Sequence, residues 1–326
     1  MGRERGFYER AKACSTVCSL LLAACRLASG ADLGYRVAPD WPELPAGWNF
    51  GEVASVAANM GGRILVFHRG PHPIMEFESA GKFVRSWGDG MISWSPGPST
   101  PSYGSLPARP QCDSCGAHTV RVDPEGNIWV VDVGGHLVVK MNQKGRVLMQ
   151  LGRRSVPGTG HANFNMPTDV AFAPNGDFYV TDGYGNSRVV KYSREGKYLL
   201  EWGTRGSGPG EFMLPHAVVL DARGRVYVAD RETRRIEIFD SEGKFLGQWK
   251  DVGGFSGLVM SKEQQIWAAG GSYVVLLNLE GQALGTLAPA GKLPGQVDAA
   301  HGIAVSDRGD VYVAELNWRV QKFVKQ

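Results

Sequence analysis

A glycine-containing turn followed by a short β-rich run recurs six times along this chain, and this repeat limits the possible folds more than any other feature. Clear copies read DPEGNIWVVD, APNGDFYVTD, DARGRVYVAD and SDRGDVYVAE, and weaker copies read NMGGRILVFH and SKEQQIWAAG. Repeats of about 40 to 50 residues are typical of propeller blades. The β-rich runs fit this period, except for a longer first spacing, and begin at Ile64, Ile128, Phe178, Val226, Ile266 and Val311.

A second glycine-centred pattern follows in each of the first five units, as in SREGKYLLEWG and DSEGKFLGQWK. Glycine supplies the positive φ that tight hairpins need, and the alternating residues around it supply the two faces of a strand. Each unit therefore predicts about four strands. The expected fold is all-β, a six-bladed β-propeller of four-stranded antiparallel blades.

Residues 31–326 are expected to form this propeller as one domain. The sixth unit ends at Gln326 after three strands, so we expect the segment Tyr35–Val53 to supply its missing outer strand. The long first spacing leaves an insertion at 91–115, which is rich in Pro, Ser and Gly. This insertion is predicted to be a loop at the mouth of the propeller.

Residues 1–30 have the pattern of a targeting segment. Basic residues precede an apolar run, Ala13–Ala24, that is too short to span a bilayer comfortably. A signal peptide or lipoprotein leader is therefore predicted, which places the mature chain outside the cytoplasm: periplasmic, secreted or lipid-anchored. The sequence LAAC fits a bacterial lipobox with a lipid on Cys25, and ordinary cleavage near Ser29 or Gly30 is the alternative.

Two cysteines, Cys112 and Cys115, remain beyond the leader. In an oxidising compartment such a pair is most often a local disulfide, and a metal knuckle with His118 is the alternative.

The charges exclude some partners. The 35 basic and 32 acidic residues give a net charge of +3 and are interspersed, which predicts no nucleic-acid partner. Membrane contact is expected only through a lipid on Cys25, and the protein is expected to be a monomer.

Three histidines fall at the same position of the repeat. Eight residues before the turn glycine, units two, four and six have His118, His216 and His301, whereas the other units have the small residues Ala54, Thr168 and Ser256. Equivalent positions on alternate blades converge on the propeller axis. Three imidazoles at one point are typical of a zinc site with an open fourth position. The alternative, unrelated core or surface histidines, requires three coincidences of phase among seven histidines.

Two arginines and a tyrosine are predicted to lie at the same mouth. Arg69 and Arg231 stand seven residues after the turn position, and Tyr184 stands eight after it. The second strand runs antiparallel to the first, so these positions return to the histidine end. A lone arginine is usually solvated or salt-bridged, but two beside a metal site indicate carboxylate binding. A phenol acts as a base at neutral pH only where a cation stabilises its phenolate.

These residues lie in stretches that resemble the peptidyl-α-hydroxyglycine α-amidating lyases, within the NHL-like six-bladed propellers. LVFHRG, DGYGNSR, ADRE and AAHGIAV are among the matching stretches, which span nearly all of Glu52–Lys325. The resemblance implies that the three histidines bind zinc and that Tyr184 is the catalytic base. It also implies that Arg69 and Arg231 are the partners of the substrate and of the base.

The resemblance also implies a calcium ion, held by the backbone carbonyls of Val56 and Val120 and by an aspartate after the third histidine. This chain has Gly302 at the aspartate position. A calcium ion without its only carboxylate should bind weakly or not at all. The family's animal members have a disulfide beginning beside the tyrosine, where this chain has Gly185.

The expected function is that of a zinc-dependent lyase. It would cleave an N-acyl or peptidyl α-hydroxyglycine, a small molecule or peptide with a carboxylate, into an amide and glyoxylate, with Tyr184 as the base. The main alternative is a non-catalytic NHL-type propeller that binds a protein or ligand at its central mouth. A calcium-dependent lactonase is a third hypothesis, but such sites need carboxylate and amide oxygens where this chain offers imidazoles.

Overall fold

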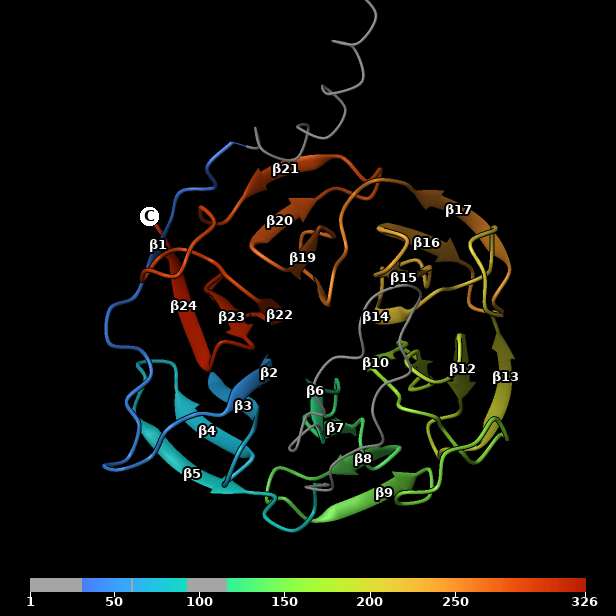
Figure 1. The fold of residues 1–326 in the computed structure, drawn as a ribbon, viewed down its shortest axis with the longest axis horizontal. Helices are drawn as coiled ribbons and strands as arrows, with labels where there is room; N and C mark the ends of the chain where they lie inside the picture. The colour runs from blue at the N-terminus through green and yellow to red at the C-terminus, as the bar shows by residue number, and fades with distance from the viewer. Residues whose placement is uncertain (1–30, 60, 93–115) are drawn as a thin grey trace, which may run out of the picture.

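The computed structural model describes residues 31–59, 61–92 and 116–326. Within these ranges the chain forms six four-stranded antiparallel sheets arranged as blades around a central axis (Figure 1). The predicted six-bladed propeller is therefore confirmed. From blade one to blade six, with the innermost strand of each blade first, the strands are β2 (Glu52–Ala58), β3 (Arg63–Arg69), β4 (Ile74–Glu78), β5 (Phe83–Trp87); β6 (Ala117–Val122), β7 (Ile128–Asp132), β8 (Leu137–Met141), β9 (Val147–Leu151); β10 (Asp169–Phe172), β11 (Phe178–Asp182), β12 (Arg188–Tyr192), β13 (Tyr198–Trp202); β14 (Pro215–Leu220), β15 (Val226–Asp230), β16 (Arg235–Phe239), β17 (Phe245–Trp249); β18 (Gly257–Met260), β19 (Ile266–Gly270), β20 (Tyr273–Leu277), β21 (Ala283–Thr286); β22 (Ala300–Val305), β23 (Val311–Glu315), β24 (Arg319–Lys325) and β1 (Tyr35–Val37).

The ring is closed by the N-terminal strand, as expected. Strand β1 pairs antiparallel with β24, with Tyr35 opposite Lys325 and Val37 opposite Phe323, so the last blade joins both ends of the propeller. Figure 1 shows the blue strand β1 beside the red strand β24. The strand is shorter than the segment Tyr35–Val53 that was expected to supply it, because the chain leaves the sheet after Val37 and enters blade one at Glu52.

The turn between the two inner strands of each blade needs a left-handed backbone at one residue. Gly224 has φ 78° there, and Gln264 has φ 59° at the equivalent place in blade five. The structure therefore confirms that Gln264 stands in for the repeat's glycine. A glutamine is strained in this region, where glycine is not.

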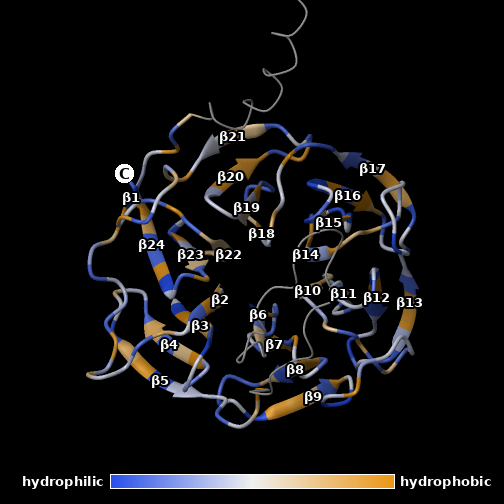
Figure 2. Ribbon diagram, in the orientation of Figure 1, coloured by the Kyte–Doolittle hydropathy of each residue, from blue (hydrophilic) through white to orange (hydrophobic). Residues whose placement is uncertain are grey.

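The apolar core lies between neighbouring blades rather than at the axis. Trp129 of blade two, for example, packs in one cluster with Phe178 and Tyr192 of blade three. Ring contacts between Trp129 and Phe178 at 4.7 Å between centroids join the two sheets. Figure 2 shows the apolar residues concentrated on the strands. Because the sheets pack face to face through such clusters, the inner strands hold fixed positions around the axis.

Several sequence-based expectations lie outside the described residues. The leader at 1–30, with Cys25, is among them, as are residues 93–115 of the predicted insertion, with Cys112 and Cys115. At the start of that insertion, Ile92 is buried in the cluster between blades one and two. Among the described residues, no helix is long and apolar enough to cross a membrane.

Candidate metal and active site

The three in-phase histidines meet at the propeller axis. His118, His216 and His301 are each the second residue of an innermost strand, in β6, β14 and β22. Their potential ligand atoms all lie within 4.8 Å of one another, and no other group of this kind occurs in the described part of the chain. All three side chains are buried, with at most 4% exposed.

Each of these histidines lies in a β-bulge, which sets the direction of its side chain. In β6 the register with β7 skips from Ala117 to Thr119, so that His118 has no partner residue across the sheet. The same skip occurs around His216 in β14 and around His301 in β22. Bulges commonly redirect a side chain at a site. Here they release each imidazole from the sheet pattern at the inner edge of its blade.

The neighbouring blade fixes the orientation of each ring. The Nδ1 atoms of His118, His216 and His301 lie 2.6, 2.8 and 2.7 Å from the backbone oxygens of Thr168, Ser256 and Ala54. These acceptors are the small residues that occupy the histidine position in blades three, five and one. A carbonyl oxygen only accepts, so each Nδ1 carries the proton and each Nε2 keeps its lone pair. Such an outer hydrogen bond is typical of metal-binding histidines.

The Nε2 atoms have the environment that a metal site requires. Those of His118 and His301 are buried and have no hydrogen-bond partner, and that of His216 lies 3.0 Å from the Tyr184 hydroxyl. A buried polar atom without a partner is costly, and a bound cation would remove that cost. The donor set therefore fits a metal ion with nitrogen ligands.

Burial keeps the three imidazoles uncharged. It lowers the pKa of His118 and of His216 well below the ordinary value. At His118 it is assisted by the repulsion that a protonated His301 would exert and by the charge of Arg69, and at His216 by the charge of Arg231. Burial and the charge of Arg69 lower the pKa of His301 to about 3. Neutral imidazoles with free Nε2 lone pairs are the form that binds a metal.

Tyr184 and Arg231 lie beside the three histidines. The Tyr184 hydroxyl is in the hydrogen bond to His216, and the ring of Tyr184 contacts the ring of His118 edge-on, with 5.5 Å between centroids. Arg231 Nη1 lies 3.4 Å from the Tyr184 hydroxyl oxygen. Burial opposes the charge on Arg231, but the Tyr184 oxygen and the Glu232 carboxylate outweigh it and raise the pKa of Arg231. The tyrosine thus has a permanent cation next to its hydroxyl.

Arg69 lies on the other side of the ring, in blade one. Its Nε donates to the backbone oxygen of Ala117, the residue before His118, at 3.0 Å. Its Nη1 donates to Glu52 at 2.7 Å in an ion pair. The structure therefore brings the three predicted histidines together with Tyr184, and the two predicted arginines flank them from blades one and four.

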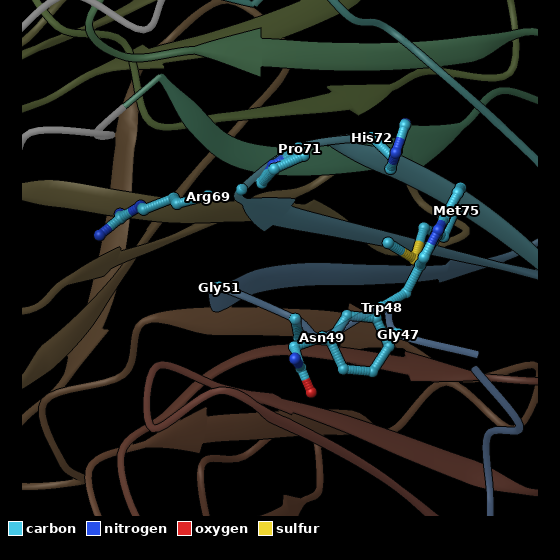
Figure 3. A pocket seen from close by; sticks show the side chains of 10 residues that line it. Gly47, Trp48, Asn49, Gly51, Arg69, Pro71, His72 and Met75 are labelled. Carbon is cyan, nitrogen blue, oxygen red and sulfur yellow. The ribbon is translucent and has the colours of Figure 1, made fainter. Parts of the chain in front are cut away.

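A cavity of about 530 Å³ opens beside Arg69. Trp48, Phe50, Pro71 and Met75 give it apolar walls, and Figure 3 shows the Arg69 side chain extending away from Trp48 and Met75. Its size is typical of small-molecule pockets.

The positions implied for calcium include no carboxylate. The implied ligands at Val56 and Val120 are backbone carbonyls, and Gly302 has no side chain that could coordinate the ion. A Cβ added at Gly302 would lie 2.6 Å from the Cα of Ser55, so the backbone leaves no room for an aspartate without moving. The weak or absent calcium binding expected from the sequence remains a prediction.

The other four histidines have structural partners. The Nδ1 atoms of His68 and His136 accept backbone N–H groups of Gly51 and Met166 at 3.0 and 2.9 Å. His72 pairs with Asp89, and His161 stacks on Tyr198.

Sequence reasoning missed two further residues of the site, Glu52 and Glu232, which form ion pairs with the two arginines. Of these two, only Glu232 lies in a stretch that the sequence analysis had singled out, because it is the last residue of ADRE.

Comparisons with known proteins agree with this geometry. The NHL repeat family matches residues 164–192 and 212–239. The chain is 33% identical over 306 residues to peptidyl-glycine alpha-amidating monooxygenase A of Xenopus laevis, covering 85% of this chain and 32% of that protein. It is 40% identical over 128 residues to a probable peptidyl-alpha-hydroxyglycine alpha-amidating lyase of Caenorhabditis elegans, covering 38% of this chain and 37% of that one.

A third relative is matched over most of its length. NHL repeat-containing protein 3 of Homo sapiens is 28% identical over 316 residues, covering 89% of this chain and 84% of the relative. By contrast, this chain spans about a third of the length of the amidating monooxygenases. Among solved structures, a streptogramin B lyase superposes with a TM-score of 0.60 at 15% identity, covering 91% of this chain and 100% of that one, which shows a shared fold. The chain is thus a six-bladed β-propeller with NHL repeats, similar in sequence to the peptidyl-α-hydroxyglycine α-amidating lyases and to NHL repeat-containing protein 3.

Proposed function

We propose that this protein is a zinc-dependent lyase that splits an N-acyl or peptidyl α-hydroxyglycine into an amide and glyoxylate. The observation that carries the proposal is the three-histidine cluster. Three Nε2 lone pairs converge, each fixed by a hydrogen bond at Nδ1, beside a tyrosine hydroxyl that an arginine contacts. Three imidazoles suit zinc with one position left for substrate. The relatives named as amidating lyases support the reaction class.

Tyr184 is the base in this proposal. Zinc, when bound, would supply a Lewis acid to the substrate hydroxyl. The Tyr184 phenolate accepts the hydroxyl proton, the O–H electron pair becomes the new carbonyl bond, and the C–N bond breaks. The electron pair of that bond leaves on the amide nitrogen, which takes up a proton. Atoms and electrons balance without an oxidant or reductant, so the reaction is an elimination.

The two arginines have different parts in this proposal. Arg231 stabilises the Tyr184 phenolate through Nη1 at 3.4 Å and through its charge over the ring, with Cζ 5.6 Å from the ring centroid. Arg69 binds the substrate carboxylate, since guanidinium N–H groups suit a carboxylate.

A non-catalytic binding propeller is the second candidate. One observation leaves it open: NHL repeat-containing protein 3, of which the chain covers 84%, is named for its repeats and not for a reaction. In that case the histidines would hold a metal or ligand structurally at the mouth, and no turnover would occur.

We also propose that the chain acts outside the cytoplasm as a monomer, either released by ordinary cleavage near Ser29 or Gly30 or anchored by a lipid on Cys25 as its one membrane contact. The basic and apolar pattern of residues 1–30 supports export. Cell fractionation checks the location, and a Cys25→Ser variant that loses metabolic labelling with a fatty acid would identify the anchor. Protein found only in the cytoplasm would contradict the proposal.

Replacement of Tyr184 by phenylalanine separates the two candidate functions. Tyr184→Phe removes one hydroxyl and leaves the histidines and the ring contacts in place. The lyase should keep its zinc content and melting temperature but lose about 10²-fold or more in kcat on an N-acyl-α-hydroxyglycine. An unchanged kcat would remove Tyr184 from the mechanism. Absence of turnover in the wild-type protein, with zinc bound, would favour the binding propeller.

A further inference from the structure

The Glu232 carboxylate accepts two hydrogen bonds from one edge of the Arg231 guanidinium. Both Nε and Nη2 of Arg231 donate to the same oxygen, Glu232 Oε1, at 3.1 and 2.9 Å. The third nitrogen, Nη1, is the one that faces the Tyr184 hydroxyl. One edge of the guanidinium is therefore held by a carboxylate while the opposite nitrogen points at the proposed base.

The backbone that carries Glu232 is fixed by its own hydrogen bonds. Glu232 lies in the tight turn between β15 and β16, where the Arg234 N–H donates to the Arg231 oxygen at 3.2 Å. The Thr233 hydroxyl donates to the Asp230 carboxylate at 2.5 Å. Asp230 is fully buried and also accepts the backbone N–H of Leu214 at 2.7 Å. The Glu232 side chain therefore starts from a rigid turn that is anchored in blade four.

Stability alone does not account for this ion pair. The Arg231 side chain is 24% exposed and that of Glu232 is 41% exposed. An ion pair with one partner this exposed contributes little to folding stability. An arginine side chain samples many rotamers when unrestrained, and two N–H donors held on one carboxylate oxygen restrict that sampling. The pair therefore restricts the direction of Arg231 more than it strengthens the fold.

We propose that Glu232 is a positioning residue, which holds Arg231 so that Nη1 faces the Tyr184 hydroxyl. The proposal rests on the proposed function, in which Tyr184 accepts the substrate proton. The positioning role and a purely electrostatic role of Glu232 predict opposite changes in kcat when its carboxylate is removed. Removing an anion next to Arg231 would by itself strengthen the positive potential at the Tyr184 hydroxyl and raise kcat, whereas loss of positioning would break the contact and lower it.

Two variants of Glu232 and one matched control test the proposal. Glu232→Ala removes the acceptor, and Glu232→Gln removes the charge but keeps an oxygen that can accept from Nε and Nη2. The control is Glu125→Ala, which breaks the exposed pair with Arg194 at 2.8 Å, in the β6–β7 turn at the other end of its blade. Zinc content and melting temperature are measured for every variant. Crystal structures of the zinc-loaded wild type and both Glu232 variants give the position of Arg231.

The expected results separate positioning from charge. In Glu232→Ala the Arg231 guanidinium should leave Tyr184, and kcat on an N-acyl-α-hydroxyglycine should fall about tenfold or more while KM changes less than about threefold. Glu232→Gln should keep the contact and keep kcat within about threefold of the wild type. Glu125→Ala should match the wild type throughout.

Three results would overturn the proposal. They are an Arg231–Tyr184 contact that persists in Glu232→Ala, a kcat that is unchanged or raised in that variant, and a Glu232→Gln variant as impaired as Glu232→Ala. A wild-type protein that releases no glyoxylate would instead contradict the proposed function. The crystal structures would then decide the positioning role alone.

Discussion

The three axial histidines owe their direction to two local features that repeat in blades two, four and six. A bulge frees each residue from the ladder, and a carbonyl of the next blade binds Nδ1. The repeat's phase predicted that these side chains would meet. It could not predict the bulges, because a one-residue shift in strand register leaves no mark in the sequence. The carbonyl acceptors were also unpredictable, because any residue offers a backbone oxygen.

Loss of a single histidine should lower the metal content of the purified protein. His118→Ala, His216→Ala or His301→Ala leaves two imidazoles, fewer than the three protein ligands of a catalytic zinc shell. Zinc per chain, measured by mass spectrometry of dialysed protein, should fall from one to well below one. His161→Ala is the control, since His161 stacks on Tyr198 away from the cluster. Full zinc content in all three variants would contradict the assigned ligands.

The stability of the metal-free protein should fall on acidification. The pKa of His301 is about 3 in the folded chain and about 6.5 in an unfolded one, so between these values the unfolded state binds a proton that the folded state does not. The free energy of unfolding should therefore decrease by about 1.4 kcal/mol per pH unit from this group as pH falls below 6.5. Urea unfolding of chelator-treated protein at several pH values measures it.

His301→Gln is the matching variant, because glutamine has no charge to gain. The difference in free energy of unfolding between wild type and His301→Gln should shift in favour of the variant as pH falls from 6.5 to 4. A difference that does not change with pH would show that His301 titrates normally in the folded protein.

At the scale of the element, a buried carboxylate ends the second strand of most blades. Asp132, Asp182, Asp230 and Glu315 are each 0% exposed, and each accepts a backbone N–H from a mouth segment. In the sequence, these acidic residues are the last residue of each clear copy of the repeat. Their role was not predicted, because a repeated acid at a strand end also fits an exposed turn. The structure shows that they hold the loops that carry Tyr184 and Arg231.

Asp182 gives a direct test of this role. Asp182→Ala should destabilise the fold by about 3–5 kcal/mol, because it removes the fully buried carboxylate partner of the buried Arg188 guanidinium, 3.1 Å away. Glu201→Ala removes the partly exposed partner of the same arginine and should cost about 1 kcal/mol or less. Chemical denaturation measures both. Equal costs for the two variants would mean that Asp182 is no more important than a surface ion pair.

At the scale of the whole molecule, the ring depends on pairing between its two ends. Blade count and the missing outer strand were predictable, because the repeat period and the unfinished sixth unit are visible in the sequence. The length of β1 was not, because three strand residues carry too little pattern. Residues beyond Val37 instead place Trp41 against Tyr312 of blade six and Phe77 of blade one.

A chain that begins at Ala38 tests ring closure. It lacks β1, so β24 becomes an exposed edge, and Tyr35 no longer donates to the Gly309 oxygen or packs on Trp267. Its melting temperature should lie at least about 5 °C below that of a chain beginning at Ala31. Equal melting temperatures would show that the sixth blade is stable with three strands.

The most direct test of the proposed activity is product formation by purified protein on a synthetic N-acyl-α-hydroxyglycine. Glyoxylate and the amide are quantified together, for protein as purified, after chelator treatment and after return of zinc. A zinc-dependent lyase should release the two products in equal amounts, lose both on chelation and regain both when zinc is returned. Absence of glyoxylate from zinc-loaded wild-type protein, or equal rates with and without chelator in protein shown to be metal-free, would contradict it.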